Sequence, residues 1–366
     1  MILHVGIVGA SHRRAVEGPS RALTCAGARD KRESMRICVL QSAFTTPIDN
    51  FRCDPSPWLP EHTCEHHFIR KASAAREVRA LARRGRFDLF INLCDGGGDS
   101  DEAGIDVVVA LERLGVAFTG ADRAFYEPTR EVMKLAAHAA GIPTPPYVFA
   151  ADLSAVDVAA QRLRFPLLVK HANSYGSIGM TRGSRVTTPE ALRAEVGRFL
   201  DCFGGAMIEE FIEGREFTVL VAENPEDPRA PVAFTPLELL FPPGETFKHY
   251  ALKFVDFARM RGVPVTDPAL AGRLAALSCG LFVGLDGRSY GRCDLRMDQA
   301  GELHMLEINP NCGIFYPLEG AGCADISLGH DPRGHRGFLE LIVASALSRE
   351  RRRRRTSARS AALGAA

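Results

Sequence analysis

Two extended runs in the C-terminal third constrain the fold most, because they carry charges inside a strand pair that should be half-buried. The segment "YGRCDLRMDQAGELHMLEIN" spans residues 290–309 and turns at "QAGE". In a hairpin that closes at the central Ala-Gly pair, Asp294 faces Glu307 and Arg292 faces Asn309. Directly opposed carboxylates repel each other, so we expect a cation between Asp294 and Glu307.

The donor atoms of this hairpin point to a divalent metal ion. Glu307 and Asn309 share one face of their strand, and Leu306 and Ile308 are expected to point to the other. With Asp294 they offer two carboxylates and an amide carbonyl, which suit Mg²⁺ when waters and substrate phosphates complete the shell. The alternative is a solvent-facing hairpin whose charges are simply hydrated.

A metal held in this way usually carries phosphates, and other segments supply further parts of a nucleotide site. Arg292 can hold an oxyanion bidentately beside the metal ligands. Lys170 closes the apolar strand "FPLLVK", and the Gly/Ser loop "NSYGSIGM" can close over a triphosphate through its backbone N–H groups. This loop is not a P-loop, because no Gly-Lys-Ser/Thr follows it. "MIEEFIEGREFTV" adds an extended edge for adenine and acids for ribose hydroxyls, although each acid alone is typical of plain surface.

Composition and charge limit the class of protein. The 366 residues suffice for two or three domains, and 46% hydrophobic and 24% charged residues are typical of a soluble globular protein. No run approaches the roughly 18 apolar residues of a membrane span. The net charge of +1 contains +6 from residues 349–359 and +3 from residues 1–34, which leaves about −8 for residues 35–348 and argues against a nucleic-acid-binding body. The basic tail is expected to be disordered, with contact to nucleic acid or an anionic surface as the alternative.

Cysteine spacing indicates the compartment. The ten cysteines form no C-x-x-C pair, so we expect reduced thiols inside the cell, in the cytoplasm. The cluster of His62, Cys64, His66 and His67 suggests zinc, but no second ligand cluster follows, so a polar loop is favoured. Two interpretations of residues 1–34 remain, a structured strand and a targeting leader. "ILHVGIVGA" is typical of a strand, whereas the Arg-rich, acid-poor stretch after it has transit-peptide character, which would imply organellar import.

The order of the elements predicts an α/β fold. A strand begins at Met35, a helix covers "KASAAREVRALARRGRF", and "DLFINL", "CDGGGDSDEAG" and "IDVVVALERLG" follow as strand, glycine turn and helix. This order is typical of an open α/β sheet with a ligand site at its strand ends. "IPTPPYVFA" is expected to be a stiff connector. Further helices are predicted at "TREVMKLAAHAAG", "PEALRAEVGRFL", "PALAGRLAALSCGLFVG" and "GHRGFLELIVASALS", and further strands at "AMIEEFI", "REFTVLVAE" and "PVAFTPLELL".

With these segments in this order, the sequence resembles the ATP-grasp superfamily, and within it the D-alanine–D-alanine ligase group, over about residues 87–345. The resemblance implies an α/β (α+β) ATP-grasp fold with an N-terminal open parallel α/β domain. The implied domains are an extension at 1–34, the N-terminal domain at 35–125, a central subdomain with a phosphate lid loop at 126–215, a C-terminal subdomain with the metal site at 216–347, and the tail at 348–366.

The resemblance also implies three groups of site residues. The phosphate-binding residues are Lys134, Lys170, Lys253 and, in the lid loop, Ser177. The adenine linker and the ribose-binding acid are Glu209, Phe211, Ile212 and Glu216. Arg292 steadies the reacting carboxyl group, and the metal ligands are Asp294, Glu307 and Asn309. Arg292, Lys253 and Ser177 are the residues expected to act directly on the reacting groups.

The substrate segments depart from the family pattern. "NPNCG" carries Cys312 where the family has proline, and "GIFYPLEGAG" lacks the serine usually offered to the second amino acid. Asp95 stands where the first-domain loop usually has a histidine, and the "GG-S-E" signature for the first ammonium group is missing from "VLQSAFTTP". The resemblance therefore implies intact ATP chemistry with substrate pockets unlike those for two D-alanines.

The expected function is ATP-dependent carboxylate–amine ligation. A carboxylate is phosphorylated, and an amine attacks the acyl phosphate to give an amide, ADP and phosphate, with the Gly/Ser loop as a lid that excludes water. The expected cofactors are ATP and two Mg²⁺ ions, with Mn²⁺ as the alternative metal. The expected partners are a small-molecule carboxylate and amine, both amino acids, and a homodimer is left open. The alternatives are a phosphotransferase acting on a small molecule and a non-catalytic nucleotide sensor.

Overall fold

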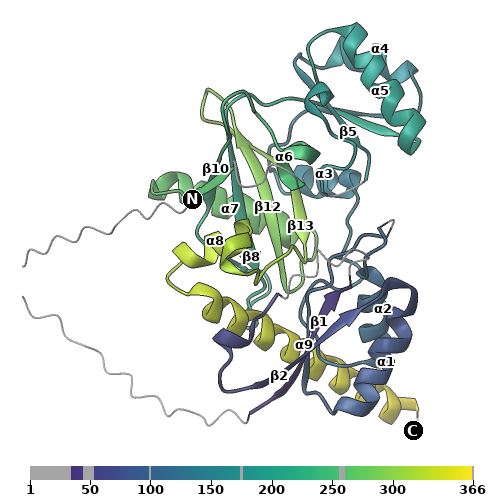
Figure 1. The fold of residues 1–366 in the computed structure, drawn as a ribbon, viewed down its shortest axis with the longest axis vertical. Coiled ribbons are helices and arrows are strands. Elements are labelled where there is room, and N and C mark those ends of the chain that lie inside the picture. The colour runs from purple at the N-terminus through teal and green to yellow at the C-terminus, as the bar shows by residue number, and fades with distance from the viewer. Residues whose placement is uncertain (1–33, 44–52, 99, 174–175, 255–259, 365–366) are drawn as a thin grey trace, which may run out of the picture. The chain divides into compact units, whose positions relative to one another are not determined.

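The computed structural model describes residues 34–43, 53–98, 100–173, 176–254 and 260–364. In this part of the chain, helices and strands form three sheets with covering helices (Figure 1). The expectations for residues 1–33 lie outside the described residues. No helix in the described ranges is both long and apolar enough to cross a membrane.

The first sheet is parallel, with the strand order β2-β1-β3 among the described residues. Its strands and helices are β1 (Arg36–Ser42), β2 (Thr63–Ile69), β3 (Leu89–Asn92), α1 (Ala74–Gly85) and α2 (Ile105–Leu114). Cys38 and Leu40 pack with α1 and α2, whereas Ile37 and Val39 pack on the opposite face with α9 (Gly334–Gly364). A sheet covered on both faces needs continuously apolar strands, and "RICVLQS" and "LFIN" provide them.

The second sheet has the order β4-β7-β5-β6 and is antiparallel. Its elements are β4 (Tyr147–Ala150), β5 (Leu167–His171), β6 (Arg185–Val186), β7 (Ala206–Glu210), α4 (Ser154–Arg162) and α5 (Pro189–Phe203). Val156 of α4 and Phe199 of α5 pack on Val169 and Ile208 in one apolar cluster. The helices therefore cover one face of this sheet, and residues on its other face can line a binding site.

The third sheet is antiparallel, with the order β11-β10-β8-β12-β13 and β9 paired to β8. Its strands are β8 (Arg215–Ala222), β9 (Val232–Ala233), β10 (Leu237–Leu240), β11 (Arg261–Pro264), β12 (Tyr290–Met297) and β13 (Leu303–Pro310). The remaining helices are α3 (Arg130–Ala139), α6 (Tyr250–Phe254), α7 (Pro268–Gly284) and α8 (Cys323–His330). Val219 and Cys293 pack toward α3 and α7, whereas Leu220 lies in the cluster that includes α8 and α9.

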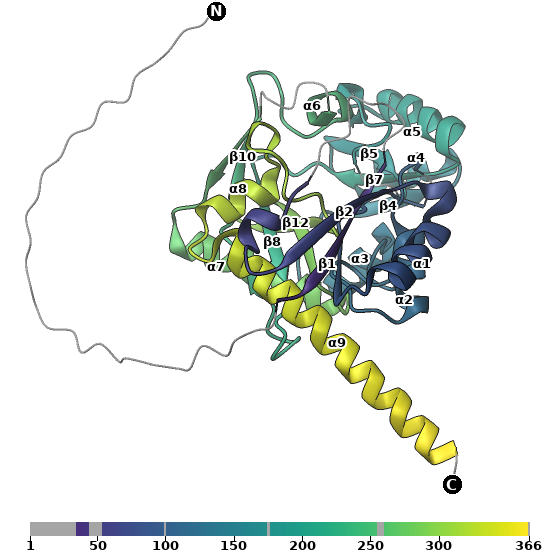
Figure 2. The ribbon, with the colours of Figure 1, turned by 60° about the horizontal axis from the view of Figure 1, so that its bottom comes forward.

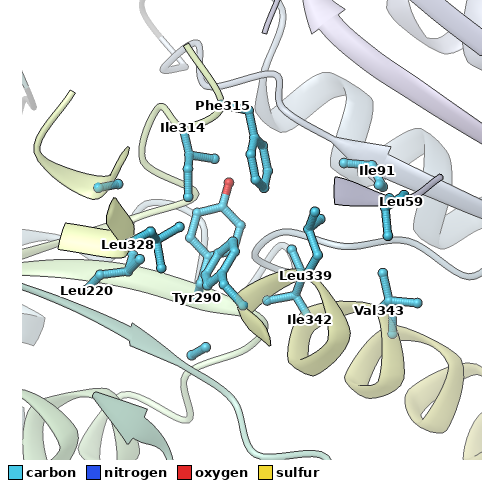
Figure 3. Close-up of a cluster of buried hydrophobic side chains, with 14 of the residues drawn as sticks. Leu59, Ile91, Leu220, Tyr290, Ile314, Phe315, Leu328, Leu339, Ile342 and Val343 are labelled. Carbon is cyan, nitrogen blue, oxygen red and sulfur yellow. The ribbon is translucent and has the colours of Figure 1, made fainter. Parts of the chain in front are cut away.

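Helix α9 joins the first and third sheets through one apolar cluster. Figure 3 shows Leu339, Ile342 and Val343 of α9 among Ile91 of the first sheet and Tyr290 of the third. Figure 2 shows α9 crossing the first sheet and continuing beyond it. The carboxyl ends of β1 and β3 therefore have a defined position relative to the β12–β13 hairpin.

The structure corrects several expectations about elements. The segment expected to be a polar loop around His66 is strand β2, because Thr63–Ile69 pairs in parallel with β1 along its whole length and contains the strand-favouring residues Thr63, Phe68 and Ile69. "PVAFTPLELL" is split into β9 and β10 around Pro236, which has no N–H for a strand ladder. The connector "IPTPPYVFA" ends in strand β4, and α4 was not predicted. The tail expected to be disordered continues α9 to Gly364, because arginine and alanine favour helix and because Arg349 is anchored by Glu223.

Candidate active site

The β12–β13 hairpin brings the predicted residue pairs together. Asp294 faces Glu307 and Arg292 faces Asn309, which confirms the pairing expected from the sequence. The turn itself differs from the expectation, because residues 298–302 lie between the paired strands. The register shifts by one residue between this turn and the acidic pair, at a β-bulge.

The bulge residue is Leu306, because the pairs on its two sides are Asp294–Glu307 and Leu295–Met305. Leu306 and Glu307 both line the pocket in front of the hairpin, whereas Met305 lies in the core. The expectation that Leu306 points away from Glu307 was wrong, because a bulge changes the alternation of side chains. Without it, Glu307 would share the buried face of Met305.

The acids of β8 and β12 share a lysine that the sequence did not indicate. Lys248 Nζ lies 3.2 Å from Asp294 Oδ2 and 3.1 Å from Glu216 Oε1. Arg296 donates to the other Glu216 oxygen at 2.9 Å. Burial alone would raise the pKa of Asp294, but Lys248 and then Arg292 outweigh burial and hold that pKa well below its usual range.

Glu307 has its own cation. Arg130, the first residue of α3, donates from Nη1 to Glu307 Oε2 at 2.5 Å and from Nε to the His171 carbonyl at 3.2 Å. Burial favours the protonated carboxyl, yet Arg130 and then Lys170 lower the pKa of Glu307 to about 2. Both hairpin carboxylates are therefore ionised at neutral pH. The cation paired with Glu307 is Arg130, and those paired with Asp294 are Lys248 and Arg292.

The donor set at the hairpin fits a hard divalent cation. Asp294 Oδ1 is buried and has no hydrogen-bond partner. In the ranges that the structure describes, no three His, Cys, Asp or Glu side chains form a metal-binding group. The hairpin itself offers two carboxylates and one amide oxygen. A metal ion here would bind Asp294, Glu307 and the Asn309 amide oxygen, and substrate oxygens would have to complete its shell.

Two of the expected phosphate-binding lysines form ion pairs with the same glutamate. Lys170 of β5 forms an ion pair with one oxygen of Glu209 on β7, and Lys134 of α3 lies 3.3 Å from the other oxygen. All three residues are buried. Burial lowers the pKa of Lys134 to about 8, and Glu209 only partly offsets this effect. Glu209, expected in the adenine linker, thus holds both lysines in place.

The rest of the pocket wall is apolar. The apolar side chains that line it are Leu168, Met180, Phe211, Ile212 and Phe247. The Arg296 guanidinium lies 4.6 Å from the Phe211 ring centroid. Ser177 in the Gly/Ser loop also lines the pocket, and its hydroxyl donates to the Lys248 carbonyl at 2.9 Å. A pocket of this kind suits a planar base between its apolar side chains and an anionic group at its charged end.

Four predicted residues lie near this pocket without lining it: Lys134, whose ion pair is given above, and Arg292, Asn309 and Lys253. Arg292 lies 3.4 Å from Asp294, and the Asn309 amide donates to the Arg292 carbonyl at 3.5 Å. Lys253 of α6 is within electrostatic range of Arg292, Lys248 and the hairpin acids. Burial, then Arg292 and Lys248, lower the pKa of Lys253 to about 8.

Three cationic residues that line the pocket were missed from the sequence, and only one had a local signal. Arg296 continues the alternation of Arg292 and Asp294 along β12, so the hairpin pattern could have predicted it. Arg130 and Lys248 reach the site from α3 and from the segment before α6. Their places depend on tertiary packing, which spacing along the chain does not encode.

Comparison with known proteins identifies related ligases. The family model described as "D-ala D-ala ligase C-terminus" matches residues 136–316. A D-alanine–D-alanine ligase of Ralstonia pickettii (strain 12J) is 31% identical over 282 residues, which cover 74% of this chain and 78% of that protein. A D-alanine–D-alanine ligase of Marinomonas sp. (strain MWYL1) is 28% identical over 236 residues, which cover 62% of this chain and 69% of that protein.

Two solved structures share the fold. The D-alanine–D-alanine ligase from Coxiella burnetii superposes with a TM-score of 0.66 at 16% identity and covers 91% of this chain and 100% of that chain. The Bacillus anthracis ligase complexed with ATP has a TM-score of 0.63 at 18% identity and covers 87% of this chain and 99% of that chain. At these identities the likeness shows the fold alone.

Together, the fold, the pocket and the relatives define an ATP-dependent carboxylate–amine ligase of the ATP-grasp class. A phosphotransferase is not favoured, because the curated relatives are named as ligases. Within this class, the chain belongs to the D-alanine–D-alanine ligase family.

Proposed function

We propose that this chain joins the carboxyl group of one amino acid to the amine of a second through an acyl phosphate, with ADP and phosphate as products. The observation that carries the proposal is the opposed Asp294–Glu307 pair in a pocket that Lys170 also lines. Two carboxylates beside a lysine suit a metal-bridged triphosphate. D-alanine is the first candidate substrate, because the relatives are named D-alanine–D-alanine ligases.

The residues of the pocket divide the work between binding and chemistry. Phe211 and Ile212 would hold the base, and Glu216 would take the ribose hydroxyls. Lys134, Lys170, Lys253 and Ser177 would bind the phosphates. We assign the metal as Mg²⁺, two ions with Mn²⁺ as the alternative, held by Asp294, Glu307 and Asn309. When bound, such ions neutralise phosphate charge and polarise the transferring phosphoryl group.

Charge that develops during phosphoryl transfer would be stabilised by groups that are already in place. Lys170 is fixed by Glu209, and Arg292 is fixed by Asp294, so neither needs to reorganise as the reaction proceeds. Arg292 would orient the reacting carboxyl group. The apolar wall and the Ser177 loop would limit the access of water to the acyl phosphate.

The proposal is tested by a screen for ADP release. Purified protein with ATP and MgCl₂ is given D-alanine, then other amino acids singly and in pairs, and product masses are read by mass spectrometry. We expect ADP release that depends on both an amino-acid carboxylate and an amine, with a dipeptide or amide as product. ADP release together with a phosphorylated small molecule, and no amide, would contradict ligation.

A further inference from the structure

Helix α9 continues past the sheet that it covers, and it carries a run of arginines there. Residues 349–355 read "RERRRRR", and the side chains from Arg351 to Arg355 are exposed. The backbone stays helical from residue 354 to Gly364, which is about 16 Å of helix. Figure 2 shows this end of α9 beyond the first sheet. The run therefore projects from the molecule as a helix and not as an irregular tail.

Two contacts fix the direction of this projecting helix. Arg349 pairs with the buried Glu223 and donates to the Phe118 carbonyl at 3.1 Å. About one turn later, Arg353 donates to the carbonyl of Gly115, the residue that caps α2. Residues four apart lie on the same side of a helix. One side of α9 is therefore held against the body, and the remaining arginines are left for other partners.

These remaining arginines have few partners within the protein. In the part of the chain that the structure describes, Arg352 donates to the Ser348 hydroxyl at 2.8 Å, and Arg354 pairs with Glu350, the single acid of the run. At about 100° per residue, five consecutive arginines point to every side of the helix. Like charges three and four residues apart destabilise a helix. A polyanion that binds this run would relieve that repulsion.

A cavity at the base of the run adds an arginine from another segment. The residues that line this cavity are Glu223, Pro228, Arg288, Arg349 and Arg352. Arg288 precedes β12, and its Nε lies 3.8 Å from Asp122 Oδ2, a long ion pair between partly exposed groups. Glu223 is already used by Arg349 and by the Ser289 N–H. The cavity thus has an excess of guanidinium groups, whose planar donors match the oxygens of a phosphate.

We propose that the arginine-rich end of α9, with Arg288 at its base, binds the phosphate backbone of duplex DNA without regard to sequence. The major groove of B-form DNA is about 12 Å wide and admits an α-helix, which is about 10–12 Å across. Phosphates then lie on both sides of the helix and reach arginines that point in different directions. Residues 35–348 carry a net charge of about −8, so the contact is confined to this end of the chain.

The competing partner is an anionic membrane surface. A helix that binds a membrane lies flat, with an apolar face in the interface. Residues 349–360 contain no large apolar side chain. A flat surface would also leave the arginines on the far side of α9 in water. Duplex RNA fits less well than DNA, because its major groove is deep and narrow.

The test removes the unanchored arginines and keeps the two contacts. The variant carries Arg351→Gln, Arg352→Gln and Arg355→Gln, because glutamine favours helix and both Arg349 and Arg353 stay. Binding of a short labelled DNA duplex to the full-length protein is followed by fluorescence anisotropy at rising salt concentrations. Four phosphate contacts predict a slope of log Kd against log salt of about 3–4 for the wild-type protein and about 1 for the variant. We expect the variant to bind about 10- to 100-fold more weakly at low salt.

A matched control removes the same charge elsewhere. It carries Arg162→Gln, Arg193→Gln and Arg273→Gln, which are exposed on α4, α5 and α7, and it should bind DNA like the wild-type protein. Lysine at the three α9 positions keeps the charge and should retain most of the slope. Melting temperatures of all variants should match that of the wild-type protein. These measurements do not depend on the proposed ligase function.

Four outcomes would overturn the proposal. An equal loss of binding in the control would show an effect of net charge alone. Sedimentation with phosphatidylserine-containing vesicles, in the absence of DNA binding, would make the partner a membrane. Tighter binding of an RNA duplex of the same sequence would contradict the groove assignment. Wild-type protein that binds no duplex at low salt would make the run a solvated helix end.

Discussion

At the scale of single residues, the pocket is a set of buried ions that each depend on a partner. Glu307 pairs with Arg130, Glu209 with Lys170, and Lys248 with two acids. Removing one partner of a buried pair leaves an uncompensated charge and costs about 3–5 kcal/mol. Substitutions in this pocket therefore need a stability measurement beside the activity measurement.

Glu307 is the most direct test of the metal assignment. We expect Glu307→Ala to leave a folded protein with little ligase turnover, and Glu307→Gln, which keeps an acceptor for Arg130, to lower kcat by about 100-fold or more. The measurement is magnesium-dependent ADP release at saturating substrates, with circular dichroism to verify the fold. The matched control is Glu302→Gln at the exposed turn of the same hairpin. Unchanged turnover in Glu307→Gln would contradict the metal assignment.

The Arg130–Glu307 pair predicts a pH dependence of stability. The pKa of Glu307 is about 2 in the folded protein and about 4.3 in an unfolded chain. A lowered pKa stabilises the fold above about pH 4.3, and that contribution is lost as the pH falls toward 2. We therefore expect Arg130→Met to lower the free energy of unfolding by about 3 kcal/mol at pH 7 and by much less at pH 2.

Urea unfolding of both proteins at pH 7 and pH 2, without metal, measures this difference. The control is Arg70→Met, which removes an exposed arginine from its ion pair with Glu77 and should change stability by less than about 1 kcal/mol at either pH. An equal loss of stability at both pH values in Arg130→Met would show that Arg130 acts by packing and not by charge.

At the scale of elements, the bulge in β13 decides which side chains reach the pocket. Deleting Leu306 would place Glu307 directly after Met305, so strict alternation would keep Glu307 on the pocket face and leave the Asp294–Glu307 pair in register. We expect the deletion to retain ADP release and to lower the free energy of unfolding by about 1 kcal/mol through loss of the leucine side chain, as measured by a coupled assay and urea unfolding.

The substitution Leu306→Ala separates the bulge from the side chain. It keeps the chain length and the register, and Leu306 is only partly buried, so we expect a loss of about 1 kcal/mol and retained turnover. A deletion variant without turnover beside an active Leu306→Ala would show that the bulge itself is needed to aim Glu307 into the pocket.

The hairpin also shows how far the sequence could predict the site. Its acidic pair was predictable, because alternation and the pairing of two short runs are local properties. The five-residue turn and the bulge were not predicted, and their effects on register cancel at Asp294 and Glu307. Arg130 and Lys248 could not be predicted, because packing between distant segments places them.

At the scale of the whole molecule, the described part of the chain from residue 34 onward is held together by helix α9. Its first half was predictable from apolar periodicity over "GHRGFLELIVASALS". Its continuation was not, because a run of arginines has no apolar face and is equally typical of a solvated tail. The structure gives this run one buried anchor, Arg349, which pairs with Glu223 and donates to the Phe118 carbonyl at 3.1 Å.

The Arg349–Glu223 pair indicates which part of the basic helix contributes to the free energy of unfolding. Glu223 is 1% exposed and also accepts from the Ser289 N–H at 2.9 Å, so it cannot turn to water when its arginine is removed. We expect Arg349→Met to lower the free energy of unfolding by about 3 kcal/mol, and Glu223→Gln to restore part of the loss in the double variant. A chain that ends after Arg353 keeps the anchor and the hydrogen bonds of Arg353 to the Glu112 and Gly115 carbonyls, so its urea midpoint should match that of the full chain. A truncated chain as unstable as Arg349→Met would mean that the outer turns of α9 hold the sheets together and that the Arg349–Glu223 pair does not.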